Sequence, residues 1–96
     1  METSKDIKVK LEKIVNYLKT SGCSKILLYG SLAEGVHHIN SDIDIAVIGL
    51  SSKEFFKAVA VLPFLVKHRV DLVDFGELPP KFQQSIEKNG VVLYAN

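Results

Sequence analysis

The 96-residue sequence contains very little cysteine and almost no net charge. A single cysteine, Cys23, excludes an internal disulfide and a zinc site built from several cysteines, and it fits a reducing compartment. Twelve Lys and Arg against eleven Asp and Glu give a net charge of +1, far from the basic excess of a protein that coats nucleic acid. We therefore expect no direct binding to nucleic acid.

Long apolar runs are also missing. The longest, Ala58–Val66, has nine residues including Pro63, whereas a helix that crosses a bilayer needs about 20 residues. The amino end has no apolar segment behind it that could act as a signal peptide. Because 47% of the residues are hydrophobic, the chain can form a modest core. We expect a single, cytoplasmic domain over residues 1–96 that does not contact membranes.

Hydrophobic periodicity predicts helices that alternate with short strands. Apolar residues recur every three to four positions between Ser4 and Thr20, which predicts a helix that ends at Ser21-Gly22. Ser51 and Glu54 have the spacing of a capping box, and they predict a helix that Pro63 ends after Leu62. The other predicted elements are strands at Lys25–Tyr29, Asp42–Ile48, Arg69–Phe75 and Val91–Tyr94, helical turns at Leu32–His37, a polar loop at His38–Ser41, and a helix from Pro79-Pro80 to Gly90.

This order, αβ(α)βαβαβ, predicts the α/β class. Helices that alternate with strands typically cover a small sheet, and we expect a mixed, four-stranded one.

Aspartates occur inside two of the predicted strands, although this residue is depleted in strands. Asp42 and Asp44 alternate with apolar residues, so both point to one face, with Cα atoms roughly 6.5 Å apart. Asp71 joins that face if the third strand lies beside the second, whereas Asp74 has the opposite phase and is expected to cap the strand end. Like charges this close need a positive partner, and magnesium prefers oxygen ligands. The pattern predicts a metal site, with capping as the alternative.

Gly30 and Ser31 directly follow the first predicted strand. A glycine there allows a sharp turn and a close approach of backbone amides to a ligand, and a serine hydroxyl can donate to a phosphate oxygen. The turn is a candidate phosphate-binding loop, with an ordinary strand-to-helix turn as the alternative. The glycine-rich fingerprints of P-loop and dinucleotide-binding proteins are both missing.

Taken together, these motifs resemble those of one family. Gly30-Ser31, then Ser41-Asp42-Ile43-Asp44, and later Val70-Asp71-Leu72 are similar to the motifs of polymerase-β-type nucleotidyltransferases, specifically their minimal (MNT) members. The resemblance runs from the strand before Gly30 to the end of the chain. It implies a single minimal nucleotidyltransferase domain with the family's α+β fold.

The resemblance also implies a role for each motif. Gly30, Ser31 and Ser41 would bind the nucleotide, while Asp42, Asp44 and Asp71 would be catalytic and would hold two Mg²⁺ ions. Asp71 would act as the base near the acceptor hydroxyl. The implied reaction transfers AMP from ATP to a hydroxyl of a protein partner. Small family members pair with a helical HEPN-domain RNase, as the antitoxin of a toxin–antitoxin system, so a HEPN protein is the expected partner.

One departure from the family pattern leaves a second function open. Members often carry arginines after the Gly-Ser pair, where this chain has Leu32 and Glu34, and the loss of positive charge there weakens attraction to a triphosphate. The only arginine in the chain is Arg69. The alternative is an interaction module with little or no activity, which neutralises its partner by occlusion. A receiver-like domain is excluded because it would need a fifth strand and a lysine after a late strand.

Other polar residues fit structural roles. His37 and His38 are expected in an exposed polar loop rather than at a metal, Cys23 as a small packing residue, and Tyr29 in the core or at its rim. Exposed sheet edges and helix faces in so small a domain also make a homodimer plausible.

Overall fold

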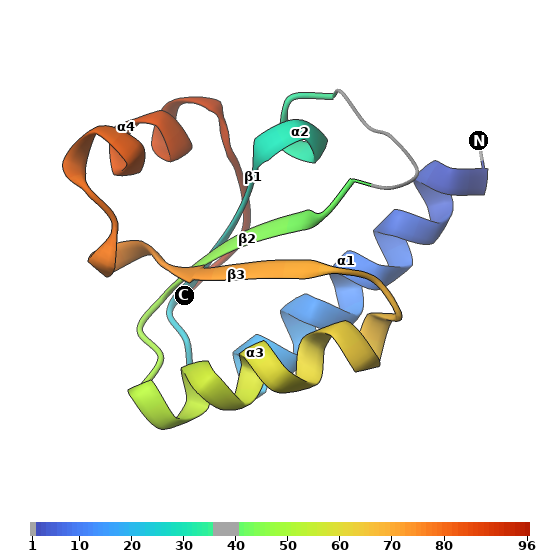
Figure 1. Cartoon of the computed structure of the whole chain (residues 1–96), viewed down its shortest axis with the longest axis horizontal. Helices are drawn as coiled ribbons and strands as arrows, with labels where there is room; N and C mark the ends of the chain where they lie inside the picture. The colour runs from blue at the N-terminus through green and yellow to red at the C-terminus, as the bar shows by residue number, and fades with distance from the viewer. Residues whose placement is uncertain (1, 36–40) are drawn as a thin grey trace.

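The computed structural model describes residues 2–35 and 41–96, which form an alternating series of helices and strands (Figure 1). The elements are α1 (Glu2–Thr20), β1 (Lys25–Tyr29), α2 (Gly30–Ala33), β2 (Ile43–Ile48), α3 (Ser52–Val66), β3 (Val70–Asp74), the 3₁₀ turn η1 (Phe75–Glu77), α4 (Pro80–Asn89) and β4 (Val91–Ala95). None of these helices is both long enough and apolar enough to span a bilayer.

The four strands form one mixed sheet in the order β3-β2-β1-β4. Strand β1 pairs antiparallel with both β2 and β4, and β3 pairs parallel with β2. Helix α3 supplies the long connection that a parallel pair requires. The predicted fold class and the four-stranded mixed sheet are therefore confirmed.

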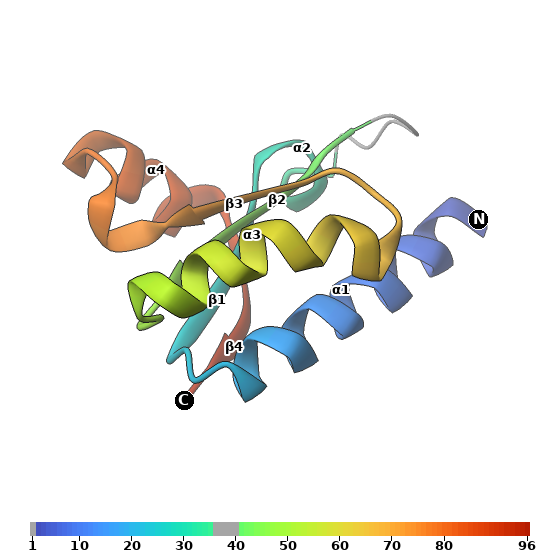
Figure 2. The same cartoon turned by 60° about the horizontal axis from the view of Figure 1, so that its bottom comes forward.

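Helices α1 and α3 lie side by side over one face of the sheet (Figure 2). The main core lies between these helices and the sheet, and its fully buried members include Ile14, Leu18, Ile43, Ile45 and Leu62. A smaller cluster on the opposite face joins Leu27, Ala46 and Ile86 under α4. Because strand side chains alternate, Ile43 and Ile45 anchor β2 in the main core, and Asp44 and Ala46 point to the other face.

The end of α1 confirms the prediction at Gly22. This glycine has a left-handed φ of 103°, and the amides of Gly22 and Cys23 donate to the carbonyls of Lys19 and Leu18 at 3.0 and 3.3 Å. The two bonds form a Schellman motif, which requires the left-handed conformation that glycine adopts easily. Cys23 follows directly and is buried, and burial raises the pKa of its thiol. It is thus a packing residue, as expected.

Helix α3 begins as predicted but ends later. The Ser51 hydroxyl accepts a hydrogen bond from the Glu54 amide at 3.2 Å, whereas Pro63 lies inside the helix, which continues to Val66. The prediction that Pro63 ends the helix was wrong. Proline removes one helical hydrogen bond, but one more turn buries Val66 beside Leu62 in the core, and this packing outweighs the local cost.

The short helix α2 also differs from its predicted range. It begins at Gly30 rather than Leu32 and closes with hydrogen bonds from the amides of Glu34 to Gly30 and of Gly35 to Leu32. Gly35, with φ of 80°, then leaves the helical conformation. The rest of the predicted Leu32–His37 turns and most of the His38–Ser41 loop lie outside the described residues, which omit 36–40.

The second and third strands are slightly shorter than predicted, and Asp74 explains where β3 ends. Its carboxylate accepts a hydrogen bond from the Gly76 amide at 3.1 Å and caps η1. The predicted capping role of Asp74 is therefore confirmed. The last strand, β4, extends by one residue to Ala95 beyond the predicted range.

Candidate active site

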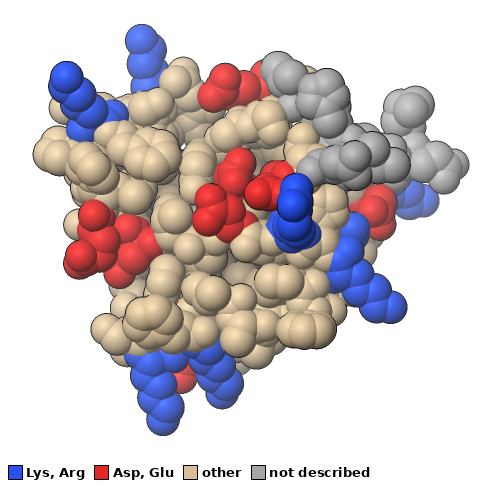
Figure 3. All heavy atoms as spheres, in the orientation of Figure 1, with Lys and Arg blue, Asp and Glu red and all other residues tan. Residues whose placement is uncertain are grey.

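A polar row crosses three neighbouring strands on the face that α1 and α3 leave open. In the pairing register Tyr29 of β1 lies opposite Asp44 of β2, and Asp44 lies opposite Asp71 of β3. Paired residues on adjacent strands share a face, with strands about 4.8 Å apart. The sheet thus brings Asp71 to the face of Asp44, as the sequence predicted. It also places Tyr29 on this face, which the sequence analysis did not predict. Figure 3 shows acidic side chains gathered on this side of the molecule.

Asp44 is at the electrostatic centre of this row. Its pKa is raised from 3.8 to about 6, first because partial burial disfavours the charged form and then because of the charges of Asp71 and Asp42. The three carboxylates therefore act on one another as the sequence predicted. In the absence of a cation, this arrangement opposes the ionisation of Asp44 at the centre.

Asp42 is paired with the only arginine of the chain. The Nε atom of Arg69 lies 2.9 Å from Asp42 Oδ1. The two groups are within ion-pair distance but are not oriented for a hydrogen bond. Asp42 Oδ1 is shielded from solvent, and no hydrogen-bond donor among the described residues reaches it. Because the arginine side chain is 79% exposed, the pair contributes at most about 1 kcal/mol to stability. A stronger cation could therefore displace Arg69 from Asp42 at little cost.

Gly30 lies against the central carboxylate. Its φ is 75°, and a Cβ atom built on it would overlap the Asp44 carboxylate. Glycine is therefore needed here for two reasons, a left-handed backbone and the space that Asp44 occupies. The two motifs that lie far apart in the sequence meet at this point.

The remaining predicted site residues lie next to these groups in the chain. Ser31 follows Gly30 in the first turn of α2 and is half-buried, and Ser41 directly precedes Asp42, with its carbonyl accepting from His68 at 2.6 Å. Leu32, one of the two departures from the family pattern, packs against the main core, and Glu34 is exposed at the end of α2. His37 and His38 lie outside the described residues.

Sequence reasoning missed the contribution of Tyr29 to this site. The predicted packing role holds for its ring, which meets Phe82 of α4 edge-to-face at 5.9 Å between centroids. The hydroxyl, however, belongs to the carboxylate row. Its pKa is raised by burial, by the charges of Asp71 and Asp44, and by a side-chain hydrogen bond with Asp71. Only the strand register, which the sequence did not reveal, identifies this role.

The carboxylate row offers the kind of oxygen ligands that magnesium prefers. Within residues 2–35 and 41–96, no three His, Cys, Asp or Glu side chains are already gathered into a cage for a metal ion. Magnesium is usually held by one or two carboxylates, together with waters and substrate phosphates, rather than by an all-protein cage. The raised pKa of Asp44 indicates that the centre of the row lacks positive charge. The donor set therefore fits a hard divalent cation.

Comparisons with known proteins agree with this geometry. The sequence pattern of the family described as "Polymerase beta, Nucleotidyltransferase" matches residues 12–96. A protein of Methanocaldococcus jannaschii named as a protein adenylyltransferase is 32% identical over 71 residues, which are 74% of this chain and 55% of that relative. The chain thus spans little more than half the length of this relative.

Solved structures share the fold. The crystal structure of a toxin–antitoxin with AMP-PNP contains a chain that is 30% identical, with a TM-score of 0.78 over 88% of this chain and 73% of the other. A second chain comes from a complex of a tri-AMPylated Shewanella oneidensis HEPN toxin with its MNT antitoxin. It is 24% identical, with a TM-score of 0.73 over 93% and 72% of the two chains, and it shows likeness of fold alone.

The raised pKa of Asp44 predicts a pH-dependent stability cost. Folded Asp44 keeps its proton up to a pH of about 6, against 3.8 for an unperturbed group, so the fold loses stability as pH rises through this interval. Without added metal, Asp44→Asn should stabilise the chain at pH 7.5. The gain should be on the order of 1 kcal/mol because the group is only partly buried, and it should vanish below pH 4.

Denaturant titrations at both pH values measure this effect. Asp74→Asn is the matched control, because Asp74 caps η1 away from the carboxylate row. A gain for Asp44→Asn that persists below pH 4 would assign the effect to packing and contradict the electrostatic explanation.

The contact between Gly30 and Asp44 predicts that Gly30→Ala impairs ligand binding, whereas Gly22→Ala does not. Gly30→Ala and Gly22→Ala both place alanine at a left-handed φ, at about 1–2 kcal/mol each. Only the first also displaces the Asp44 carboxylate, because a Cβ at residue 22 has nothing within 4 Å. Calorimetry with Mg²⁺ and ATP should show lost binding for Gly30→Ala and retained binding for Gly22→Ala. Equal binding by both variants would mean that the contact has no role in the site.

Proposed function

Because the chain belongs to the polymerase-β-type nucleotidyltransferase family, we propose that it transfers AMP from ATP to a hydroxyl group of a protein partner. The observation that carries the proposal is the row of carboxylates on paired strands β2 and β3, next to the glycine turn that begins α2. The name of the Methanocaldococcus relative and the AMP-PNP bound in a similar complex support an adenine nucleotide as donor.

The chain would bind the donor nucleotide with two of its motifs. Gly30 and Ser31 would face the triphosphate, and Ser41 would lie beside it. Asp42 and Asp44 would hold magnesium, two ions being the family arrangement, with Asp71 completing the set. When bound, magnesium would neutralise the carboxylates and the charge that develops on the phosphates.

The proposed reaction is an in-line displacement at the α-phosphorus. The acceptor oxygen forms a bond to this phosphorus, the bond from it to the bridging oxygen breaks, and pyrophosphate leaves. The proton of the acceptor hydroxyl passes to the carboxylate of Asp71, which is exposed and therefore open to an acceptor. Tyr29 lies on the same row as Asp44 and Asp71.

The departures from the family pattern weaken this proposal less than the sequence indicated. Leu32 is partly buried and packs against the main core. Arg69 supplies a guanidinium directly beside Asp42. Once a metal occupies the carboxylates, this group would be free to contact the phosphates. The remaining alternative is a module that binds its partner without modifying it.

We propose a helical HEPN-domain toxin as the partner and acceptor, with the outer face of α3 as its docking surface. Phe56 and Phe64 are 70% and 85% exposed, and with the exposed Ala60 between them they follow one helical stripe. Exposed lysines flank the stripe at Lys53, Lys57 and Lys67. Exposed aromatic groups with a basic rim favour a partner that offers an apolar pocket surrounded by acidic residues. The similar chain crystallised in a toxin–antitoxin complex supports an assembly of this kind.

The activity is tested by incubating the chain with ATP, Mg²⁺ and a HEPN protein encoded beside its gene. Mass spectrometry should detect added AMP on the partner. Asp42→Asn, Asp44→Asn and Asp71→Asn should each slow the transfer by about 100-fold or more, because each removes a carboxylate that acts on the reacting groups. Asp74→Asn should transfer AMP at the wild-type rate. A stable complex in which no AMP is added would favour occlusion and contradict the proposed activity.

The docking surface is tested separately by binding measurements. The double variant Phe56→Asp with Phe64→Asp should weaken the complex by at least about tenfold, because two exposed aromatic anchors are lost. Val92→Asp changes another exposed apolar residue, on edge strand β4, and should leave affinity unchanged. Weakening by Val92→Asp alone would place the interface elsewhere. If the Phe double variant instead converts a homodimer to a monomer, the face binds a second copy, and the docking proposal is wrong.

A further inference from the structure

Two consecutive residues after α3 hold the segment that leads into the carboxylate strand. The His68 ring contacts the Ser41 carbonyl at 2.6 Å, Arg69 Nε lies 2.9 Å from Asp42 Oδ1, and the Arg69 carbonyl accepts from the Ile43 amide at 2.9 Å. Three successive residues, 41 to 43, are therefore each held from one side. We call the two contacts with the backbone, from the His68 ring to the Ser41 carbonyl and from the Ile43 amide to the Arg69 carbonyl, the 68–69 clamp. The exposed Arg69 side chain is not part of it.

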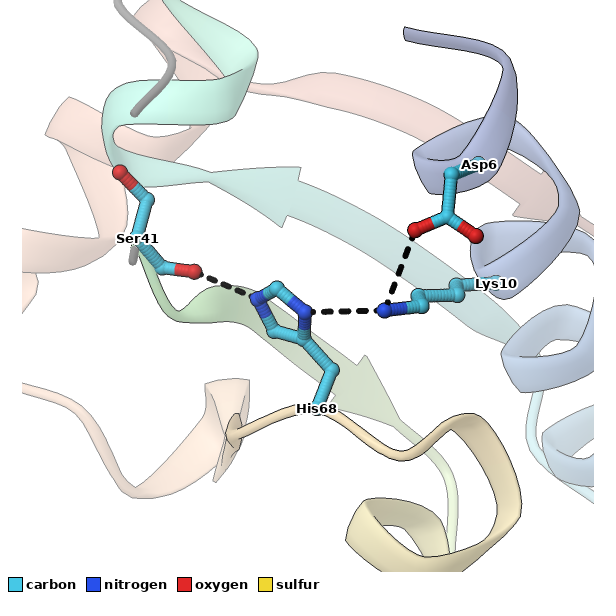
Figure 4. Close-up of polar contacts among 4 residues, drawn as sticks. All are labelled: Asp6, Lys10, Ser41 and His68. Atoms are coloured by element: carbon cyan, nitrogen blue, oxygen red, sulfur yellow. Dashed lines mark hydrogen bonds and ion pairs between the residues drawn. The ribbon is translucent and has the colours of Figure 1, made fainter. Parts of the chain in front are cut away.

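Helix α1 holds the clamp in turn. The Nδ1 atom of His68 lies 3.1 Å from Lys10 Nζ, and Lys10 pairs with Asp6 one helical turn earlier at 3.3 Å (Figure 4). Figure 4 shows the imidazole ring between the lysine and the Ser41 carbonyl. Lys10 is only 17% exposed, although lysine is usually among the most exposed residues, so its position is well defined.

The two partners determine the protonation of the ring. A carbonyl oxygen only accepts hydrogen bonds, and a lysine ammonium only donates them. The ring must therefore donate from Nε2–H to Ser41 and accept at Nδ1 from Lys10. The two contacts therefore predict the Nε2–H tautomer for His68, with Lys10 donating to Nδ1.

The turn that presents His68 has an uncommon backbone conformation. Lys67 adopts a left-handed φ of 53° at the end of α3, and the His68 amide donates to the Pro63 carbonyl at 3.3 Å. A left-handed non-glycine residue is uncommon and is maintained only where surrounding contacts compensate for it. The extra turn of α3 beyond Pro63 brings the clamp to the entrance of β2.

We infer that His68, oriented by Lys10, is a positioning residue that holds the Ser41 peptide so that the Asp42 carboxylate faces the nucleotide site. The inference rests on the proposed function. The Ser41 carbonyl belongs to the peptide group that carries the Asp42 amide, so fixing this carbonyl limits rotation of the backbone that carries the carboxylate. The clamp acts from behind the site, and neither His68 nor Lys10 is proposed to touch the substrate.

The inference is tested with binding and NMR measurements on four variants. His68→Ala and Lys10→Ala break the clamp, while His68→Gln keeps an N–H donor for Ser41 and an oxygen acceptor for Lys10. Lys13→Ala removes an exposed lysine of the same helix as a matched control. Calorimetry with Mg²⁺ and ATP should show affinity lowered about tenfold by His68→Ala, consistent with loss of one hydrogen bond to a positioned group. His68→Gln should restore most of this affinity.

NMR distinguishes positioning from a general loss of stability. In the wild-type chain, imidazole ¹⁵N shifts should identify the Nε2–H tautomer of His68. The amide signals of Ser41, Asp42 and Ile43 should move in His68→Ala and Lys10→Ala but not in Lys13→Ala. A different tautomer, unmoved amide signals, or wild-type affinity in His68→Ala would each overturn the inference. Lack of Mg²⁺-dependent ATP binding by the wild-type chain would instead overturn the proposed function, and the NMR signals would still test the clamp.

Discussion

The parallel pairing of β2 with β3 is the constraint on which the rest of the site depends. Its register sets Asp44 opposite Asp71, and strand alternation adds Asp42 to the same face. The carboxylates cannot turn away from one another, because Ile43 and Ile45 hold β2 in the main core from the opposite face. The hydrophobic core therefore holds Asp44 in place, where partial burial and then the charges of Asp71 and Asp42 raise its pKa to about 6. Unfavourable electrostatics of this kind are typical of functional sites, where the arrangement of charged groups becomes favourable only when a ligand is bound.

The surrounding residues fit this interpretation. Gly30 leaves room for the Asp44 carboxylate, and Arg69 supplies a weak, exposed positive charge beside Asp42. His68 and Lys10 determine how the chain enters β2. Most of these groups come from elements that follow or precede the acidic strand by many residues. The near-neutral total charge of the sequence thus conceals a local excess of negative charge, which a bound cation would balance.

Much of this arrangement could be predicted from the sequence, because it follows from local periodicity. Alternation placed Asp42 and Asp44 on one face, and Gly30-Ser31 after a buried strand indicated the turn. The prediction that Pro63 ends the helix failed because burial of Val66 outweighs the local effect of proline. No local sequence pattern reveals that burial. Tyr29, His68 and Arg69 were missed as site residues because their roles depend on strand register and on the turn after α3. Residues that act through tertiary contacts leave little local signal.

A crystal structure of the chain with Mg²⁺ and a non-hydrolysable ATP analogue tests whether the carboxylate row binds magnesium and nucleotide. We expect metal density at Asp42 and Asp44, triphosphate against the Gly30-Ser31 turn, and Arg69 moved from Asp42 toward the phosphates. A nucleotide bound elsewhere, with the Arg69–Asp42 pair intact and no metal at the carboxylates, would contradict this expectation.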